Sequence, residues 1–139
     1  MRILYNSKDT NFKTPFGTIT EGQKTTISIH IPKLCQTQTV TLVFRRESGE
    51  EFAAFGMTKS GEYELYEIYT CSFDISDAGL YFYFFRIETK NECFSLYREG
   101  YDMTNMEAGQ LWQLSVIPES FKVPKEYMGA MMYQIFPDR

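Results

Sequence analysis

The sequence contains little of the chemistry that most active sites need. One histidine (His30), one tryptophan (Trp112) and three cysteines occur in 139 residues. Cys35, Cys71 and Cys93 are odd in number and show no paired spacing, which argues against a disulfide framework and against a zinc site. Because a cysteine nucleophile needs a histidine base within reach, a single histidine also disfavours that class of enzyme. We expect three separate, semi-buried thiols.

Long apolar segments and an excess of basic charge are missing too. No window approaches the roughly 18 apolar residues of a membrane span, and the first nine residues hold no apolar run long enough for a signal peptide. Fourteen basic residues against eighteen acidic ones give a net charge of -4, whereas nucleic-acid-binding proteins carry a basic face. We therefore expect a cytoplasmic protein that has neither nucleic acid nor membrane as a partner.

Aromatic residues, in contrast, are abundant. Twelve Phe, ten Tyr and one Trp make up 17% of the chain, and aromatic residues favour strands. Alternation with period two recurs along the chain, while helical periodicity is nearly absent. Residues 25–31 place three isoleucines on one face. Residues 80–87 are apolar on both faces, as in a central strand covered from both sides or one that faces a partner domain. Turn residues at 48–51, 59–61, 77–79 and 89–92 separate the strands.

These patterns predict an all-β domain over residues 1–117. Seven or so short strands at regular spacing are typical of an immunoglobulin-like antiparallel β-sandwich, of the E-set or carbohydrate-binding-module type. Residues 63–75 are long enough for two strands or one bent strand, and we expect a loop over 98–109. In the last strand, 111–117, Trp112 alternates in phase with two aliphatic residues, so we place it in the core.

The composition changes after residue 117. Residues 118–127 combine two prolines with charged residues, which is typical of a linker. Within 128–139, the run 131–136 is apolar without alternation, like a strand of a parallel sheet that is buried on both faces. Such a strand cannot stand alone. We interpret 128–139 as the first strand of a further domain that this chain does not contain.

The final residues, MYQIFPDR at 132–139, resemble the opening strand of the catalytic (β/α)8 barrel in the α-amylase superfamily, glycoside hydrolase family 13. The segments 14–17, 79–84 and 112–116 are similar to the N-terminal β-sandwich that precedes this barrel in some bacterial members, in particular neopullulanase- and cyclomaltodextrinase-like enzymes. The resemblance spans nearly the whole chain and implies an N-terminal domain truncated at the first barrel strand.

The resemblance implies a parent enzyme that cleaves α-glucosidic bonds with a retaining mechanism, in which two carboxylates lie roughly 5 Å apart. These carboxylates reside on later barrel strands, beyond residue 139. We therefore expect no catalytic residue, no cofactor and no metal in this chain, and Asp138 is interpreted as a loop-start carboxylate. Any calcium would belong to the barrel, because no Asp-x-Asp-x-Asp cluster is present.

Two functions remain open for the domain itself. In the first, it is a non-catalytic accessory domain that packs on its own catalytic barrel, shapes the substrate cleft or mediates a homodimer. In the second, it binds an α-glucan oligosaccharide directly, which needs exposed aromatic rings that stack on the apolar faces of sugars. A third hypothesis is an unrelated structural or interaction sandwich whose final residues match the family by chance.

The candidate sugar contacts are Tyr66, Tyr97 and Tyr101. Tyr66 is out of phase with its alternating neighbours, and the other two flank the loop at 98–109. Tyr81 and Tyr83 are expected to be half-buried and His30 to be an exposed strand residue. The glutamates at 50–51, 62 and 64 are interpreted as charges that keep a strand edge from pairing with another sheet.

Overall fold

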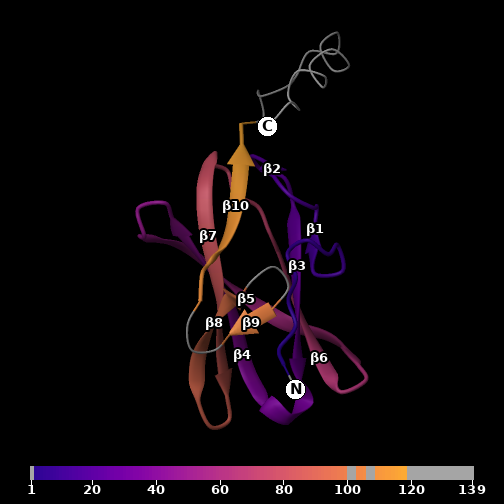
Figure 1. The fold of residues 1–139 in the computed structure, drawn as a ribbon. Coiled ribbons are helices and arrows are strands. Elements are labelled where there is room, and N and C mark those ends of the chain that lie inside the picture. Colours follow the sequence, from indigo (N-terminus) through magenta and orange to yellow (C-terminus); the bar gives the residue numbers. More distant parts are fainter. Residues whose placement is uncertain (1, 100–102, 106–108, 119–139) are drawn as a thin grey trace, which may run out of the picture.

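Strands make up nearly all of the fold. The computed structural model describes residues 2–99, 103–105 and 109–118 (Figure 1). No α-helix occurs in this part of the chain, which confirms the all-β prediction. In chain order the elements are β1 (Lys13–Thr14), β2 (Ile19–Thr20), β3 (Thr25–Pro32), the 3₁₀ turn η1 (Lys33–Cys35), β4 (Thr37–Arg46), β5 (Glu51–Tyr63), β6 (Tyr66–Phe73), β7 (Gly79–Thr89), β8 (Cys93–Glu99), β9 (Met103–Asn105) and β10 (Trp112–Ile117).

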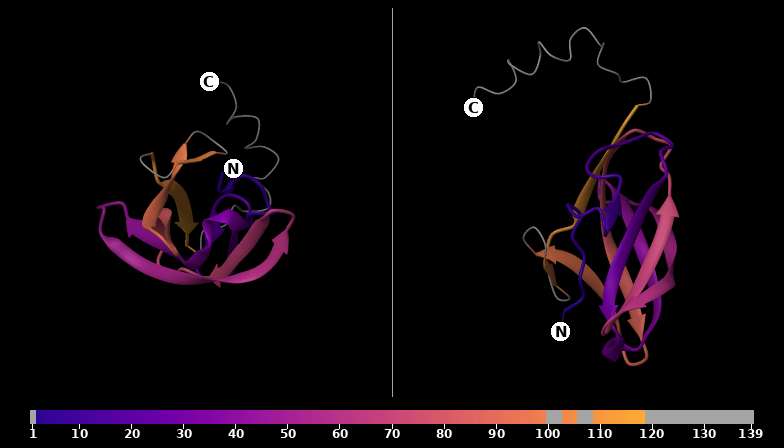
Figure 2. Two further views of the ribbon diagram at one scale, coloured as in Figure 1. Left: turned by 90° about the horizontal axis from the view of Figure 1, so that it is seen from below. Right: turned by 90° about the vertical axis from the view of Figure 1, so that its right-hand side faces the viewer.

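The strands form two layers that share one long strand. The first layer has the order β1-β3-β6-β5, and the second continues as β5-β4-β7-β10-β2, with β8 and β9 extending from the far half of β7. Because residues 51–57 of β5 pair with β4 and residues 58–63 pair with β6, the sheet curls into a cup (Figure 2). Neighbouring strands are antiparallel except β10 with β2. The arrangement confirms the predicted β-sandwich.

The core lies between the two layers and follows from the alternation. The inward isoleucines of β3, Ile27, Ile29 and Ile31, are each 0% exposed. On β7, Phe85 faces this core while its neighbour Phe84 lies on the opposite face, and both are buried. The central strand that the apolar run at 80–87 predicts is therefore confirmed.

A cluster of aromatic rings fills part of the core. Trp112 stacks on Tyr83 with 5.8 Å between ring centroids and meets Tyr5 edge-on at 5.0 Å. The hydroxyls of Tyr5 and Tyr83 lie 2.7 Å apart, and burial raises the pKa of both phenols. Tyr81 and Tyr83 are fully buried, so their expected half-burial is wrong. Both can be buried because the Tyr81 hydroxyl donates to the carbonyl oxygen of Asp77 at 2.7 Å, and Tyr83 has Tyr5.

The structure corrects one predicted turn and one predicted loop. Residues 59–61 form no turn, because β5 runs on to Tyr63; its register against β6 shifts between Lys59 and Gly61, so the small polar residues there mark a bulge. The chain reverses instead at Glu64 and Leu65, which resolves 63–75 into the end of β5 and all of β6. The expected loop over 98–109 also contains the end of β8 and the short strand β9.

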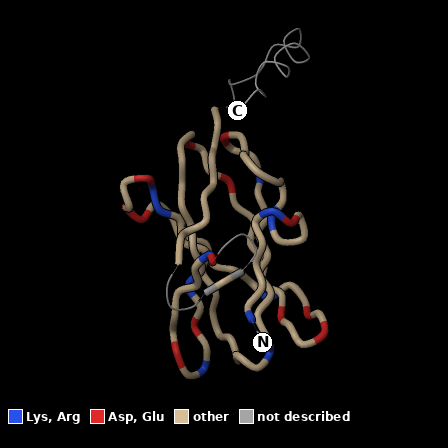
Figure 3. Tube along the Cα trace, viewed as in Figure 1, with Lys and Arg blue, Asp and Glu red and all other residues tan. Residues whose placement is uncertain are grey.

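Charged residues gather at the turns (Figure 3). Acidic and basic residues lie together in the β4–β5, β5–β6 and β7–β8 hairpins. Lys13 is an exception, because it is 3% exposed and its Nζ donates to the carbonyl oxygens of Pro15 and Gly17, both at 2.9 Å. Burial lowers the pKa of this amine. Lys13 thus anchors the segment 14–17, one of the three that carry the family resemblance.

The predicted boundary after residue 117 falls where β10 ends, at Ile117. Pro118 is the last residue described before the end of the chain. The rest of the predicted linker (119–127), the predicted barrel strand (128–139) and Asp138 lie outside the described residues. The division into sandwich, linker and barrel start therefore stays a prediction.

Candidate functional site

Tyr66 lies on the outer face of the β1-β3-β6-β5 layer. As the first residue of β6, it pairs with Pro32 of β3 on one side and with Tyr63 of β5 on the other. Its side chain is half-buried, and the ring of His30 lies 6.4 Å away. A half-exposed flat ring with a polar tip is the kind of group on which a sugar ring stacks.

Tyr63 is an aromatic neighbour that the sequence analysis missed. It is 61% exposed and lies directly opposite Tyr66 across the β5–β6 hairpin. Directly opposed residues of antiparallel strands have Cβ atoms roughly 4.5–5.5 Å apart and point to the same face. Alternation alone groups Tyr63 with Leu65 and Tyr69. The signal that could have found the pair is the spacing of two tyrosines across a two-residue turn. We call Tyr63 and Tyr66 the tyrosine pair.

His30 extends this aromatic surface along β3. Its ring packs on Phe12 at 4.6 Å between centroids and is half-buried. The expectation of an exposed histidine is thus corrected, because the N-terminal segment covers one side of the ring. Desolvation lowers the pKa of His30, while the charge of Asp9 acts in the opposite direction. The side chain therefore presents a largely neutral imidazole near pH 7.

Tyr97 lies in the other layer, on β8. Its ring stacks on Phe84 at 6.0 Å with an interplanar angle of 23°. The guanidinium carbons of Arg45 and Arg86 lie 4.9 and 5.6 Å from the centre of the same Phe84 ring. Tyr97 is half-buried, and one of its faces covers Phe84. Tyr66 and Tyr97 thus belong to different layers and form no joint site, and Tyr101 lies outside the described residues.

Trp112 is 1% exposed, which confirms its predicted place in the core. Its indole Nε1 is buried and has no hydrogen-bond partner among the residues that the structure describes. A ring so enclosed is inaccessible to a sugar.

The clearest charge cluster lies at the β5–β6 hairpin. Glu62 accepts from Lys33 at 3.0 Å and from Lys59 at 2.7 Å, and Lys59 also reaches Glu67 at 3.2 Å. The hydrogen bonds from the two lysines lower the pKa of Glu62 to about 2. Because this carboxylate stays ionised at ordinary pH, it cannot act as a general acid. The cluster ties η1 to the hairpin.

The cysteines remain separate free thiols: Cys35 is half-buried, Cys71 buried and Cys93 exposed. Burial raises the pKa of Cys71 to about 11, so its thiol stays protonated and unreactive near neutral pH. Within the described ranges, no group of three or more His, Cys, Asp or Glu side chains could hold a metal ion. In the same ranges, no helix is long and apolar enough to cross a membrane.

Fold and site together define an antiparallel β-sandwich that carries the tyrosine pair at one end of an outer face. No protein-family model matches the chain. The amylopullulanase of Thermoanaerobacterium saccharolyticum is 27% identical over 145 residues, and that of Thermoanaerobacterium thermosulfurigenes is 26% identical over 145 residues. Both matches cover 99% of this chain but only 11% and 8% of the relatives.

The fold has a solved counterpart. A cyclomaltodextrinase structure matches with a TM-score of 0.59 and 15% identity, over 84% of this chain and 19% of the other. The comparisons confirm the resemblance drawn from the sequence, because the amylopullulanases and the cyclomaltodextrinase are family 13 enzymes. At this coverage the chain corresponds to a small part of each enzyme.

Proposed function

We propose that the chain is a non-catalytic accessory domain of an α-glucan-cleaving enzyme of glycoside hydrolase family 13. The observation that carries this proposal is the coverage: nearly all of this chain matches about a tenth of an amylopullulanase. In this proposal the parent acts with the retaining mechanism of its family, through two carboxylates of the barrel. The domain is cytoplasmic and needs no cofactor.

Two measurements test this proposal. The reading frame beyond Arg139 should continue for several hundred residues and encode spaced Asp and Glu motifs. The 139-residue chain itself should release no reducing ends from pullulan or maltodextrin, whereas the longer protein should. A reading frame that stops after Arg139, or hydrolysis by the chain alone, would contradict the proposal.

Within the parent, the domain packs on the barrel, shapes the substrate cleft or mediates a homodimer. Exposed apolar side chains at one end of the sandwich support a contact role: Leu34 of η1 is 83% exposed and Leu65 of the β5–β6 turn is 60% exposed. The backbone N–H of Lys33 donates to the carbonyl oxygen of Leu65 at 2.9 Å. This hydrogen bond holds η1 beside the β5–β6 turn. This end lies opposite the exit of the chain after β10 (Figure 1).

Sedimentation of the parent protein tests the homodimer. Replacing both leucines, as Leu34→Ser with Leu65→Ser, should shift a dimer to monomer if this end forms the contact. The matched control is Phe16→Ser, which changes a side chain that is 59% exposed in the N-terminal segment. If both proteins sediment as the unmodified parent does, this end is not the dimer contact.

The second candidate function is direct binding of an α-glucan at the tyrosine pair. Tyr63 and Tyr66 are adjacent and lie on the same outer face, and His30, which packs on Phe12, lies beside Tyr66. Two adjacent tyrosine rings offer apolar faces together with hydroxyl groups, which suits the face of a pyranose ring. Tyr97, which lies in the other layer, remains a proposed contact, and so does Tyr101, which lies outside the described residues.

Calorimetric titration with maltoheptaose and with β-cyclodextrin tests the second candidate. Saturable binding between the micromolar and low millimolar range, about -8 to -4 kcal/mol, is expected. Tyr66→Ala should weaken it roughly tenfold, or about 1.4 kcal/mol, while Phe16→Ala should leave it unchanged. Absence of heat at millimolar ligand would leave the domain with a purely structural role.

A further inference from the structure

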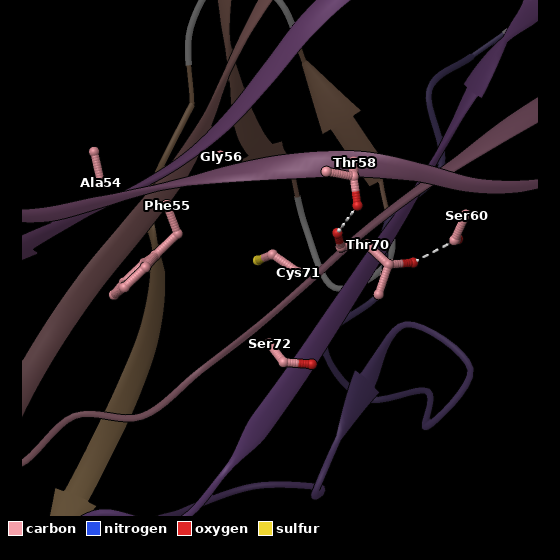
Figure 4. Close-up of a pocket in the computed structure, with 8 residues that line it drawn as sticks. All are labelled: Ala54, Phe55, Gly56, Thr58, Ser60, Thr70, Cys71 and Ser72. Atoms are coloured by element: carbon pink, nitrogen blue, oxygen red, sulfur yellow. Dashed lines mark hydrogen bonds between the residues drawn. The ribbon is translucent and has the colours of Figure 1, made fainter.

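A notch opens on the outer face where β5 crosses from one layer to the other. The β5–β6 ladder begins at the pair Thr58 and Thr70, and upstream of it β5 pairs with β4 instead. The two strands diverge there, and residues 54–56 of β5 and 71–72 of β6 border a pocket of about 550 Å³ (Figure 4). This volume falls within the range of roughly 300–1,000 Å³ that small-molecule sites occupy.

The notch is uncharged and rich in hydroxyl groups. Thr58, Ser60, Thr70 and Ser72 line it together with Phe55, whose ring extends from β5 toward β6 (Figure 4). None of the lining residues is charged. A charged ligand would lose its hydration here without gaining a counter-charge, which is costly. The lining therefore suits a neutral ligand that offers both donors and acceptors.

The hydroxyls of Thr70 and Ser72 are already oriented by neighbouring hydroxyls. The Thr70 hydroxyl lies 3.0 Å from that of Ser28 and 2.9 Å from that of Ser60, and the Ser72 hydroxyl lies 2.9 Å from that of Thr26. A hydroxyl has one donor and two acceptor positions. Linked hydroxyls fix each other's rotation and polarise one another, while each retains capacity for a further hydrogen bond.

The notch and the tyrosine pair lie on one face of β6. Residues 66, 68, 70 and 72 alternate onto the outer side of this strand, so the surface runs from Tyr66 past Ile68 and Thr70 to Ser72. At roughly 3.3 Å per residue this distance is about 20 Å. Aromatic stacking groups thus lie at one end and a hydroxyl-lined pocket at the other.

We infer that the notch is a second contact for the same glucan chain, holding a glucosyl unit through hydrogen bonds with its hydroxyls while another unit stacks on the tyrosine pair. This inference rests on the glucan-binding function proposed above. It makes binding dependent on chain length, because only an oligosaccharide of several units reaches both contacts.

Gly56 offers a variant that fills the notch without disturbing the fold. A Cβ built at Gly56 meets nothing within 4 Å, and its backbone lies outside the conformations that favour glycine. Gly56→Leu therefore adds a side chain where the sugar would lie. Ser115→Leu is the matched control, because Ser115 is an exposed strand residue of β10. Thr70→Val removes the central hydroxyl while it keeps the shape of the side chain.

The test is calorimetric titration of the 139-residue chain and its variants with maltoheptaose and maltotriose, with circular dichroism as a check on folding. Gly56→Leu should raise the Kd for maltoheptaose at least tenfold, Thr70→Val several-fold and Ser115→Leu less than twofold. The preference for maltoheptaose over maltotriose should disappear in Gly56→Leu.

Other outcomes separate this inference from the function on which it rests. If Tyr66→Ala weakens binding and Gly56→Leu does not, the notch is no contact and the glucan function stands. If the unmodified chain shows no saturable binding to maltoheptaose, both are wrong. Equal weakening by Gly56→Leu and Ser115→Leu would also overturn the inference, since the effect would then not be specific to the notch.

Discussion

At the scale of single residues, the buried hydroxyl pair of Tyr5 and Tyr83 gives the first prediction. Tyr83→Phe leaves the Tyr5 hydroxyl buried without its partner 2.7 Å away. An unpaired buried polar group costs roughly 1–3 kcal/mol, so denaturant unfolding should show a loss of that size. The double variant Tyr5→Phe with Tyr83→Phe should be more stable than Tyr83→Phe alone, because no orphaned hydroxyl remains.

If the double variant is instead less stable than Tyr83→Phe, the Tyr5 hydroxyl stabilises the folded protein even without its bond to Tyr83. The comparison separates the cost of an orphaned group from the value of the bond. It needs no change in ring packing, since Tyr83 keeps its stacking on Trp112 when it becomes phenylalanine.

Sequence alternation predicts buried residues more reliably than exposed ones. It places Trp112 and the isoleucines of 25–31 correctly, because their neighbours in phase are also apolar. It could not find the exposure of Tyr63 or the partial burial of His30. Those depend on where a turn reverses the chain and on a segment far away in sequence, Phe12, that covers the imidazole ring.

At the scale of elements, the ion cluster of Glu62 makes the β5–β6 hairpin sensitive to acid. The pKa of Glu62 lies at about 2 in the folded protein, below its usual 4.5. The unfolded chain therefore takes up a proton before the folded one does. The stabilisation by Glu62 is complete above about pH 4.5 and is lost as the pH falls toward 2.

A titration of side-chain carboxyl chemical shifts by NMR checks this prediction. Glu62 should titrate near pH 2, and Lys33→Met combined with Lys59→Met should return its pKa toward 4.5. A Glu62 that titrates near its usual 4.5 in the unmodified protein would show that the lysine contacts do not persist in solution.

A turn can be predicted from the sequence where a local signal such as a glycine marks it. The hairpin at 48–51 follows from a glycine that takes a positive φ of 93° at Gly49. The β5–β6 turn has no such signal, because Glu64 takes a φ of 54° there without being glycine. A bulge and a turn share small polar residues, so the sequence could not tell the bulge near Gly61 from a reversal of the chain.

At the scale of the whole molecule, composition and alternation predict the sandwich, and the comparisons agree with it. The sharing of β5 between both layers could not be predicted, because it depends on pairing partners distant in sequence. The candidate site follows from that sharing: the notch exists only because β5 leaves β6 beyond Thr58. Tyr66 could be singled out from its phase, but its partner Tyr63 and the hydroxyl surface required the three-dimensional register.

The last prediction concerns the extent of the domain. β10 contributes Trp112, Leu114 and Val116 to the core and pairs with both β7 and β2. β10 is therefore an integral part of the described core, and we predict that a chain of residues 1–118, which keeps β10, folds as cooperatively as the full chain. Because about 1 kcal/mol moves the Tm of a domain this size by roughly 2–8 °C, we expect calorimetric Tm values within about 4 °C of each other.

A chain that ends at residue 111 loses β10 and should not unfold cooperatively. A large fall in Tm for 1–118 would mean that residues 119–139 belong to the folded domain, which would contradict the predicted linker.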